Sequence, residues 1–73
     1  MFEEVAKILA EQLNIPQSEI KLENDIVKDL NADSLDVVEL LMTLEVNTGK
    51  TIPEEKISDL KTVADVVNLL QSL

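Results

Sequence analysis

The sequence predicts an all-α fold: a small four-helix bundle with three longer helices, one short helix and a long loop between helices one and two. Apolar residues recur at helical spacing in separate stretches, and residues that start or stop helices bound those stretches. At 73 residues the chain is expected to form a single domain, residues 1–73, with an aliphatic core because Phe2 is its only aromatic residue.

The first helix is predicted from about Phe2 to Leu13, where one face is apolar and Asn14 and Pro16 follow as stop signals. The segment from Asn14 to Asp33 is predicted to be a loop. Because this loop carries several large apolar side chains, we expect it to pack along the bundle, with a short turn near residues 18–21, and not to be disordered.

The second helix is predicted to begin at Asp33 or Ser34 and to run to about Thr48, with Gly49 as a left-handed stop. Asp33 is better placed than Ser34 to cap its start.

A short third helix is expected to open at residues 52–55, with Pro53 in its first turn. The fourth helix is expected to follow Thr62, an N-cap candidate with Asp65 at capping-box spacing, and to face the core through Val63, Val66, Val67 and Leu70.

Two apolar stripes lie on nearly opposite sides of the second helix when each residue advances about 100° around the axis. The core stripe consists of Val37, Leu40, Leu41, Leu44 and Thr48. The other, called the outer stripe here, consists of Leu35, Val38, Met42 and Val46, flanked by Glu39 and Glu45. A helix in so small a bundle seldom buries two faces, so we expect the outer stripe to bind partners. The alternative is that the long loop covers it.

The charge is strongly acidic, with 15 Asp and Glu, 6 Lys or Arg and a net charge of −9 at pH 7. Nucleic acids and anionic membranes need basic patches, so the composition excludes them and favours partners with basic surfaces. No apolar run can span a bilayer, and the acidic N-terminus lacks a signal-peptide pattern. We therefore expect a cytoplasmic monomer without stable membrane insertion.

Ser34 is the most informative residue, because it lies where a polar loop turns into the second helix. A catalytic serine needs a base to take its proton, and the chain has no His. Lys28 is the nearest Lys in sequence, and nothing indicates that it is buried and could act as this base. The negative charges of Asp33 and Asp36 would also destabilise an alkoxide at Ser34. The chain is thus predicted not to be an enzyme. The remaining options are a plain cap and an exposed attachment point, where a helix N-terminus favours a phosphate ester.

A calcium loop is a further option for this segment, because Asp29, Asn31 and Asp33 have the spacing of its first three ligands. Such a loop needs Gly at its sixth position and Glu at its twelfth, where this chain has Ser34 and Leu40. No specific metal site is predicted.

Three segments together resemble acyl carrier proteins of the dissociated, type II fatty-acid-synthase kind. They are Asp-Leu-Asn-Ala-Asp-Ser-Leu-Asp at 29–36, Val-Glu-Leu at 38–40 and Ile-Pro-Glu-Glu at 52–55. The resemblance extends over the whole chain in length, helix order and acidity.

The resemblance implies that Ser34 is esterified to 4′-phosphopantetheine, transferred from coenzyme A by a Mg²⁺-dependent phosphopantetheinyl transferase (the holo-synthase). Fatty-acyl chains would then travel as thioesters on this arm among fatty-acid-synthase enzymes, which fits a chain without Cys. It also implies docking on basic patches of those enzymes. The matching positions are Asp33, Leu35, Asp36, Val38, Glu39 and Met42, and we add Glu45 because it flanks the outer stripe.

Two positions depart from that family. Asn31 stands where the family usually has Gly, and Asn tolerates the left-handed conformation. Thr48 stands where the family often has Phe. The family shelters acyl chains in a cavity, and the smaller Thr48 would either change that cavity or let neighbouring side chains fill it.

Two alternatives stay open at this point. One is a carrier for a specialised polyketide or peptidyl pathway, against which Leu35, Asp36 and the dense acids favour fatty-acid synthesis. The other is a non-carrier helical adaptor that binds through the Leu35, Val38 and Met42 stripe, with Ser34 as a plain cap.

Overall fold

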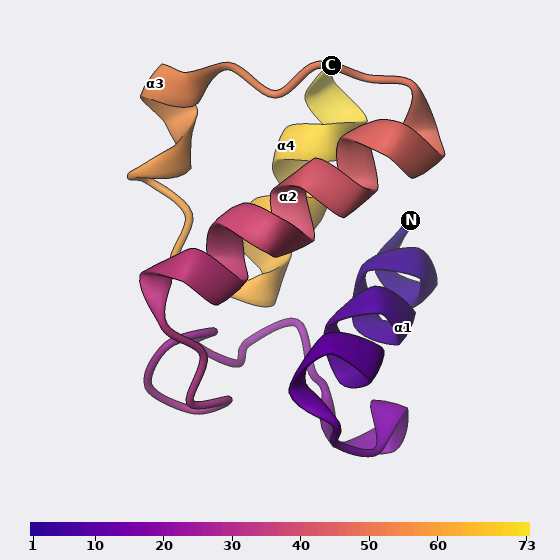
Figure 1. The fold of residues 1–73 in the computed structure, drawn as a ribbon, viewed down its shortest axis with the longest axis vertical. Coiled ribbons are helices and arrows are strands. Elements are labelled where there is room, and N and C mark those ends of the chain that lie inside the picture. Colours follow the sequence, from indigo (N-terminus) through magenta and orange to yellow (C-terminus); the bar gives the residue numbers. More distant parts are fainter.

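Four α-helices and one short 3₁₀ turn form the fold in a computed structural model that describes all residues 1–73 (Figure 1). In chain order they are α1 (Phe2–Leu13), η1 (Gln17–Glu19), α2 (Ser34–Thr48), α3 (Glu54–Ile57) and α4 (Val63–Ser72). The all-α class and the order of the helices are therefore as predicted. No helix combines the length and the apolar character that crossing a membrane requires.

Helices α1 and α2 end where the sequence indicated. Asn14 closes α1 in the left-handed conformation, with φ 57° and ψ 48°, and its N–H bonds to the carbonyl of Ala10. Gly49 closes α2 in the same region, with φ 71°. The turn expected at residues 18–21 is η1, which begins one residue earlier because Pro16 holds the extended conformation that starts it.

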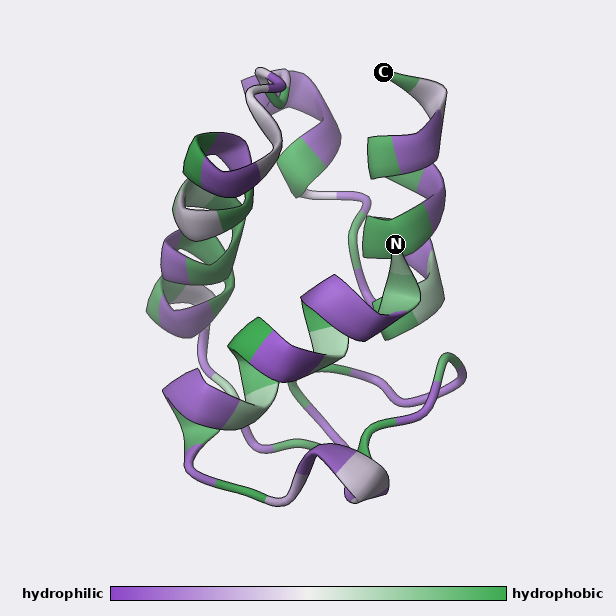
Figure 2. Cartoon of the chain, turned by 90° about the vertical axis from the view of Figure 1, so that its right-hand side faces the viewer, coloured by the Kyte–Doolittle hydropathy of each residue, from purple (hydrophilic) through white to green (hydrophobic).

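One aliphatic core joins α1, α2 and α4, and α1 packs against both of the others. The core stripe of α2 is buried at Val37, Leu40, Leu41 and Leu44, while Thr48 is half-buried. Figure 2 shows hydrophobic ribbon on the sides of α1, α2 and α4 that face one another. The predicted contributions of α4 (Val63, Val66, Val67 and Leu70) are also buried, and Leu69 joins them.

The long loop packs against the bundle through Ile20, Ile26 and Ala32, all of which are buried. Its backbone is pinned to the start of α4. The N–H of Ile26 donates to Lys61 O at 2.9 Å, and the N–H of Ala64 donates to Leu22 O at 2.9 Å. The expected packing is confirmed, although the side chains of Leu22 and Val27 remain exposed.

The start of α3 differs in one detail from the prediction. Pro53 is the N-cap, with φ −63° and ψ 132°, and not a residue of the first turn. The ring of proline fixes φ near −65°, which fits an extended residue as well as a helical one, so the sequence could not distinguish the two positions. Glu54 and Glu55 occupy the first turn as expected.

The capping box of α4 is confirmed. The Thr62 hydroxyl accepts from Asp65 N at 3.1 Å, and the Asp65 carboxylate accepts from Thr62 N at 3.0 Å and Lys61 N at 2.9 Å. The backbone hydrogen bonds from Thr62 and then Lys61 lower the pKa of Asp65 below its ordinary value.

Asp65→Ala is expected to lower the free energy of unfolding at neutral pH by about 1 kcal/mol, because the backbone N–H groups of Lys61 and Thr62 lose their carboxylate acceptor while the Thr62 cap bond remains. Because the pKa of Asp65 is lowered in the folded state, its contribution is present above the ordinary carboxyl pKa and is lost as the pH falls through the lowered value. In urea unfolding at successively lower pH, the free energies of unfolding of wild type and variant should therefore converge. Asp59→Ala, an exposed acid between α3 and α4, is the matched control and should change little. A constant difference across this pH range would contradict the assignment.

Candidate functional site

The N-terminus of α2 is closed by a reciprocal pair of carboxylates. Asp33 is the extended N-cap, and its Oδ1 accepts from Asp36 N at 2.9 Å, while Asp36 Oδ2 accepts from Asp33 N at 3.1 Å. The capping role predicted for Asp33 is confirmed. The role of Asp36 as its partner was missed, although the capping-box spacing was readable in the sequence.

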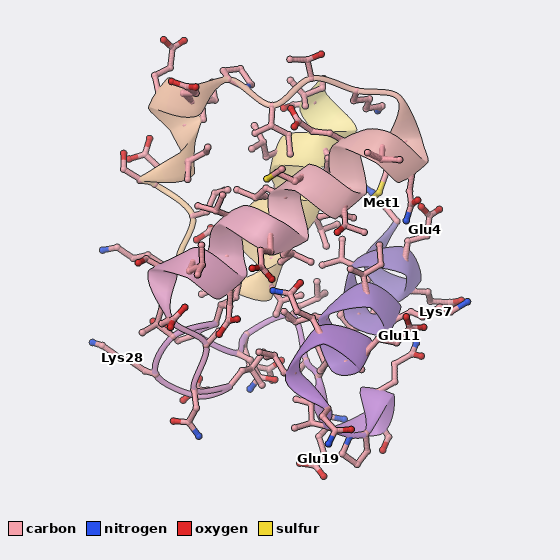
Figure 3. All side chains as sticks on the ribbon, in the orientation of Figure 1. Met1, Glu4, Lys7, Glu11, Glu19 and Lys28 are labelled. Atoms are coloured by element: carbon pink, nitrogen blue, oxygen red, sulfur yellow. The ribbon has the colours of Figure 1, made fainter.

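Ser34 is the first helical residue, is exposed, and its hydroxyl takes part in neither of these two bonds. Lys28, the nearest Lys in sequence, is exposed and points away from the molecule (Figure 3), so it does not serve Ser34 as a base. The hydroxyl is thus presented to solvent without activation from this chain. Such a group suits a reaction that a second protein catalyses.

The chain reaches Ser34 through a tightly bonded turn. Asn31 has φ 60°, so it holds the left-handed conformation that Asn was expected to tolerate. The N–H of Ala32 donates to Ile26 O at 3.1 Å. Asp25 and Asp29 close the preceding turn, where Asp29 Oδ2 accepts from Asp25 N at 2.8 Å. These bonds hold the end of the long loop against the core directly before the exposed serine.

A side chain of α1 supports the first turn of α2. Gln12 Nε2 donates to the carbonyl oxygen of Asp36 at 2.6 Å. Ser34 and Leu35 are exposed and Asp36 is only half-buried, so the turn has few buried contacts before Val37. The Gln12 bond therefore ties the serine-bearing turn to the body of the bundle. Sequence reasoning missed it because no local pattern relates Gln12 to a carbonyl so far along the chain.

The backbone at this helix start also suits an anion. The first N–H groups of an α-helix have no intrahelical acceptors, and the Asp33 carboxylate takes only that of Asp36. The N–H groups of Ser34 and Leu35 are the other donors of this turn, beside the Ser34 hydroxyl. These N–H groups and the helix dipole favour a negatively charged ester at Ser34, and they offset its electrostatic repulsion by the neighbouring carboxylates.

The outer stripe is exposed along the length of α2. The exposed fractions are 62% for Leu35, 39% for Val38, 59% for Met42 and 82% for Val46. The long loop packs elsewhere, so the alternative in which it covers this stripe is wrong. An apolar row of this kind, next to carboxylates, is typical of surfaces that bind other proteins.

The two acids that flank the outer stripe differ in their contacts. Glu39 is exposed. Glu45 is half-buried, and its Oε2 accepts from Ile52 N at 2.7 Å, which fastens the connection between α2 and α3. Glu39 is thus the freer of the two to meet a cation on a partner.

An open groove of about 500 Å³ runs between α2 and the α3 region. Its apolar lining comes from Val38, Leu41, Met42, Ile52, Pro53 and Ile57. Thr48 does not line it. The Thr48 hydroxyl donates to Leu44 O at 2.6 Å, so the hydroxyl is satisfied within its own helix.

All the residues predicted for the site belong to α2 or to its cap. Asp33, Ser34, Leu35 and Asp36 form the helix start, and Val38, Glu39, Met42 and Glu45 follow along the helix. The helix itself brings them together, without help from a distant segment. This explains why helical spacing alone was sufficient to group them.

Comparison with known proteins gives a consistent result. A family model described as "Phosphopantetheine attachment site" matches residues 3–70. The chain is 45% identical over 71 residues to the acyl carrier protein of Helicobacter acinonychis (strain Sheeba), covering 97% of this chain and 91% of that protein. It is 44% identical over 72 residues to the acyl carrier protein of Clostridium acetobutylicum, covering 99% and 94%. It is 42% identical over 73 residues to that of Campylobacter lari, covering 100% and 95%.

Proposed function

This chain belongs to the acyl carrier protein family, and from that premise we propose that Ser34 is the residue to which the 4′-phosphopantetheine arm is attached. The cofactor of the family is phosphopantetheine, and its members are carriers and not enzymes. The observation that supports Ser34 is its exposed, unbonded hydroxyl at the first position of a capped helix.

The residues at this position fit the arm. A phosphodiester on Ser34 would lie beside the free N–H groups of the first turn, where a helix N-terminus stabilises negative charge. The bound arm supplies a terminal thiol that holds acyl groups as thioesters, and the chain has no Cys of its own. Ser34 provides the tether, while Asp33 and Gln12 hold the turn that carries it.

We further propose that the carrier serves fatty-acid synthesis and docks through α2 on basic patches of its enzymes. These enzymes are the phosphopantetheinyl transferase and the fatty-acid-synthase enzymes. The docking residues are Asp33, Leu35, Asp36, Val38, Glu39 and Met42, with Glu45 at the edge. The exposure of the outer stripe and the acids beside it support this surface.

The other expectations are part of the same proposal. The buried side chains form one core, which supports one carrier domain over residues 1–73. The cytoplasmic location and the monomeric state remain predictions. A non-carrier adaptor is set aside because the family is one of carriers.

The loading experiment tests the proposal directly. The purified protein is incubated with coenzyme A, Mg²⁺ and a phosphopantetheinyl transferase of broad specificity, and its intact mass is measured. We expect a gain of one phosphopantetheine, and peptide mass spectrometry should locate it on the peptide that contains Ser34. An unchanged mass, or a gain on another peptide, would overturn the assignment.

Glu39→Lys is expected to reduce the kcat/KM of loading by roughly tenfold at low ionic strength, because it opposes the steering of an acidic helix toward a basic partner. The control is Glu4→Lys, an exposed acid on α1 that changes the net charge equally and lies away from the start of α2 (Figure 3). Rates are measured across a salt series, over which the difference between the two variants should shrink. Equal losses in both would show that only total charge matters and would contradict docking through α2.

A further inference from the structure

The chain contains few side chains that mild oxidants attack. It has no Cys, Trp, Tyr or His, and its sulfur is confined to Met1 and Met42. Met1 is half-buried and packs against the core. Met42 is 59% exposed. Because thioethers oxidise according to their accessibility, the sulfur of Met42 is the reactive group that this protein presents to solvent before its arm is attached.

Met42 also occupies the centre of the proposed docking surface. It lies one helical turn from both Val38 and Val46 in the outer stripe, and it lines the groove between α2 and α3. The other members of the outer stripe are apolar, the flanking Glu39 and Glu45 are acidic, and Thr51 is the hydroxyl-bearing residue in the lining of the groove.

A sulfoxide at this position would change the surface in a specific way. It adds a strong hydrogen-bond acceptor to an apolar row. The flanking Glu39 and Glu45 are ionised acceptors and cannot donate to it. The sulfoxide oxygen would therefore keep its water, and the apolar partner side chains that pack on the outer stripe at this position would remove that water without replacing its hydrogen bonds. Docking should weaken although the fold does not change.

We propose that Met42 is an oxidation site whose conversion to methionine sulfoxide by hydrogen peroxide weakens the docking of α2 on its enzymes. The Met42 sulfur attacks one peroxide oxygen, the O–O bond breaks, and the other oxygen leaves as water after taking the proton of the transferred oxygen. The sulfur is oxidised by two electrons and the peroxide is reduced. A methionine sulfoxide reductase with a thiol reductant reverses the change. This inference depends on the proposed function, because its readout is loading of Ser34.

The test uses the full apo chain, so that the thiol of the arm does not consume oxidant. The protein is treated with hydrogen peroxide and freed of it before the transferase is added, and peptide mass spectrometry identifies the sulfoxide. We expect the kcat/KM of loading to fall by about tenfold, in the range for losing a central interface contact, and to recover after reductase treatment. The helical circular dichroism signal should be unchanged, because Met42 is outside the core.

Met42→Leu isolates the effect, since it keeps an apolar side chain and leaves Met1 as the only thioether. Whatever its own loading rate, peroxide treatment should not alter that rate. Three results would overturn the inference alone: full-rate loading of protein that carries Met42 sulfoxide, an equal loss in peroxide-treated Met42→Leu, or loss of helix in the oxidised wild type. Failure of the untreated wild type to load at all would instead overturn the proposed function, and the inference with it.

Discussion

Ser34→Ala is expected to abolish phosphopantetheine loading completely while leaving the fold unchanged. The substitution removes the only oxygen to which the arm is proposed to attach. It should not disturb the start of α2, because the capping bonds are made by the carboxylates of Asp33 and Asp36 and not by the Ser34 hydroxyl. Alanine is also compatible with helical backbone, since it has no side chain that competes for backbone hydrogen bonds. Intact mass after incubation with coenzyme A and transferase measures the loss, and thermal unfolding followed by circular dichroism measures the fold.

Ser58→Ala is the matched control, because Ser58 is an exposed serine that also lies at a helix end, that of α3. It should load like wild type. If Ser34→Ala still gained the mass of the arm, the attachment point would lie elsewhere. If Ser34→Ala lost its helical signal, its failure to load could come from unfolding and not from the missing oxygen. Ser34→Thr, which keeps a hydroxyl, would then separate loss of the fold from loss of the attachment point.

Leu40→Ala is expected to have the largest effect on stability. Leu40 is 0% exposed at the middle of the core stripe, and truncating a buried leucine costs about 3 kcal/mol through lost burial and the cavity left behind. A domain of this size has a total stability on the order of 5 kcal/mol. Urea unfolding should therefore show a much lower midpoint, and a substantial unfolded fraction is expected on mild heating.

Leu35→Ala is the matched control for Leu40→Ala. It truncates a leucine that lies five residues before Leu40 on the same helix and has a side chain that is 62% exposed. It should shift the midpoint little, since little apolar surface leaves the core. Its expected effect is on loading, through the outer stripe. Similar stability losses in the two variants would contradict the division of α2 into a buried and an exposed apolar face.

The sequence predicted those parts of the fold that depend on neighbours within a turn or two. The caps are examples: Asp33 at the start of α2, Thr62 with Asp65 at the start of α4, and the left-handed stop at Gly49 all follow from residue types at fixed positions. The same is true of the candidate site, because one helix carries every residue assigned to it. Helical spacing is also sufficient to separate the core stripe of α2 from its outer stripe.

Contacts between distant segments were not predictable in this way. Gln12 bonds to the carbonyl of Asp36, and Lys50 Nζ donates to Leu70 O at 2.9 Å, from the loop after α2 to the end of α4. Glu45 was predicted as a residue at the edge of the docking surface, and the structure shows that it also holds Ile52 N. Each bond joins groups whose separation depends on how the helices pack.

By itself the sequence determined the helices, the caps at Asp33, Thr62 and Gly49, the exposed serine and the row of apolar and acidic residues that follows it. These features rest on the 3.6-residue period of the helix and on side chains that bond to backbone nearby. Only the tertiary structure decided where the long loop lies. Its backbone pairs with the start of α4 and its buried side chains join the core, which leaves the outer stripe uncovered. That choice depends on core packing across the whole chain, and no local pattern encodes it.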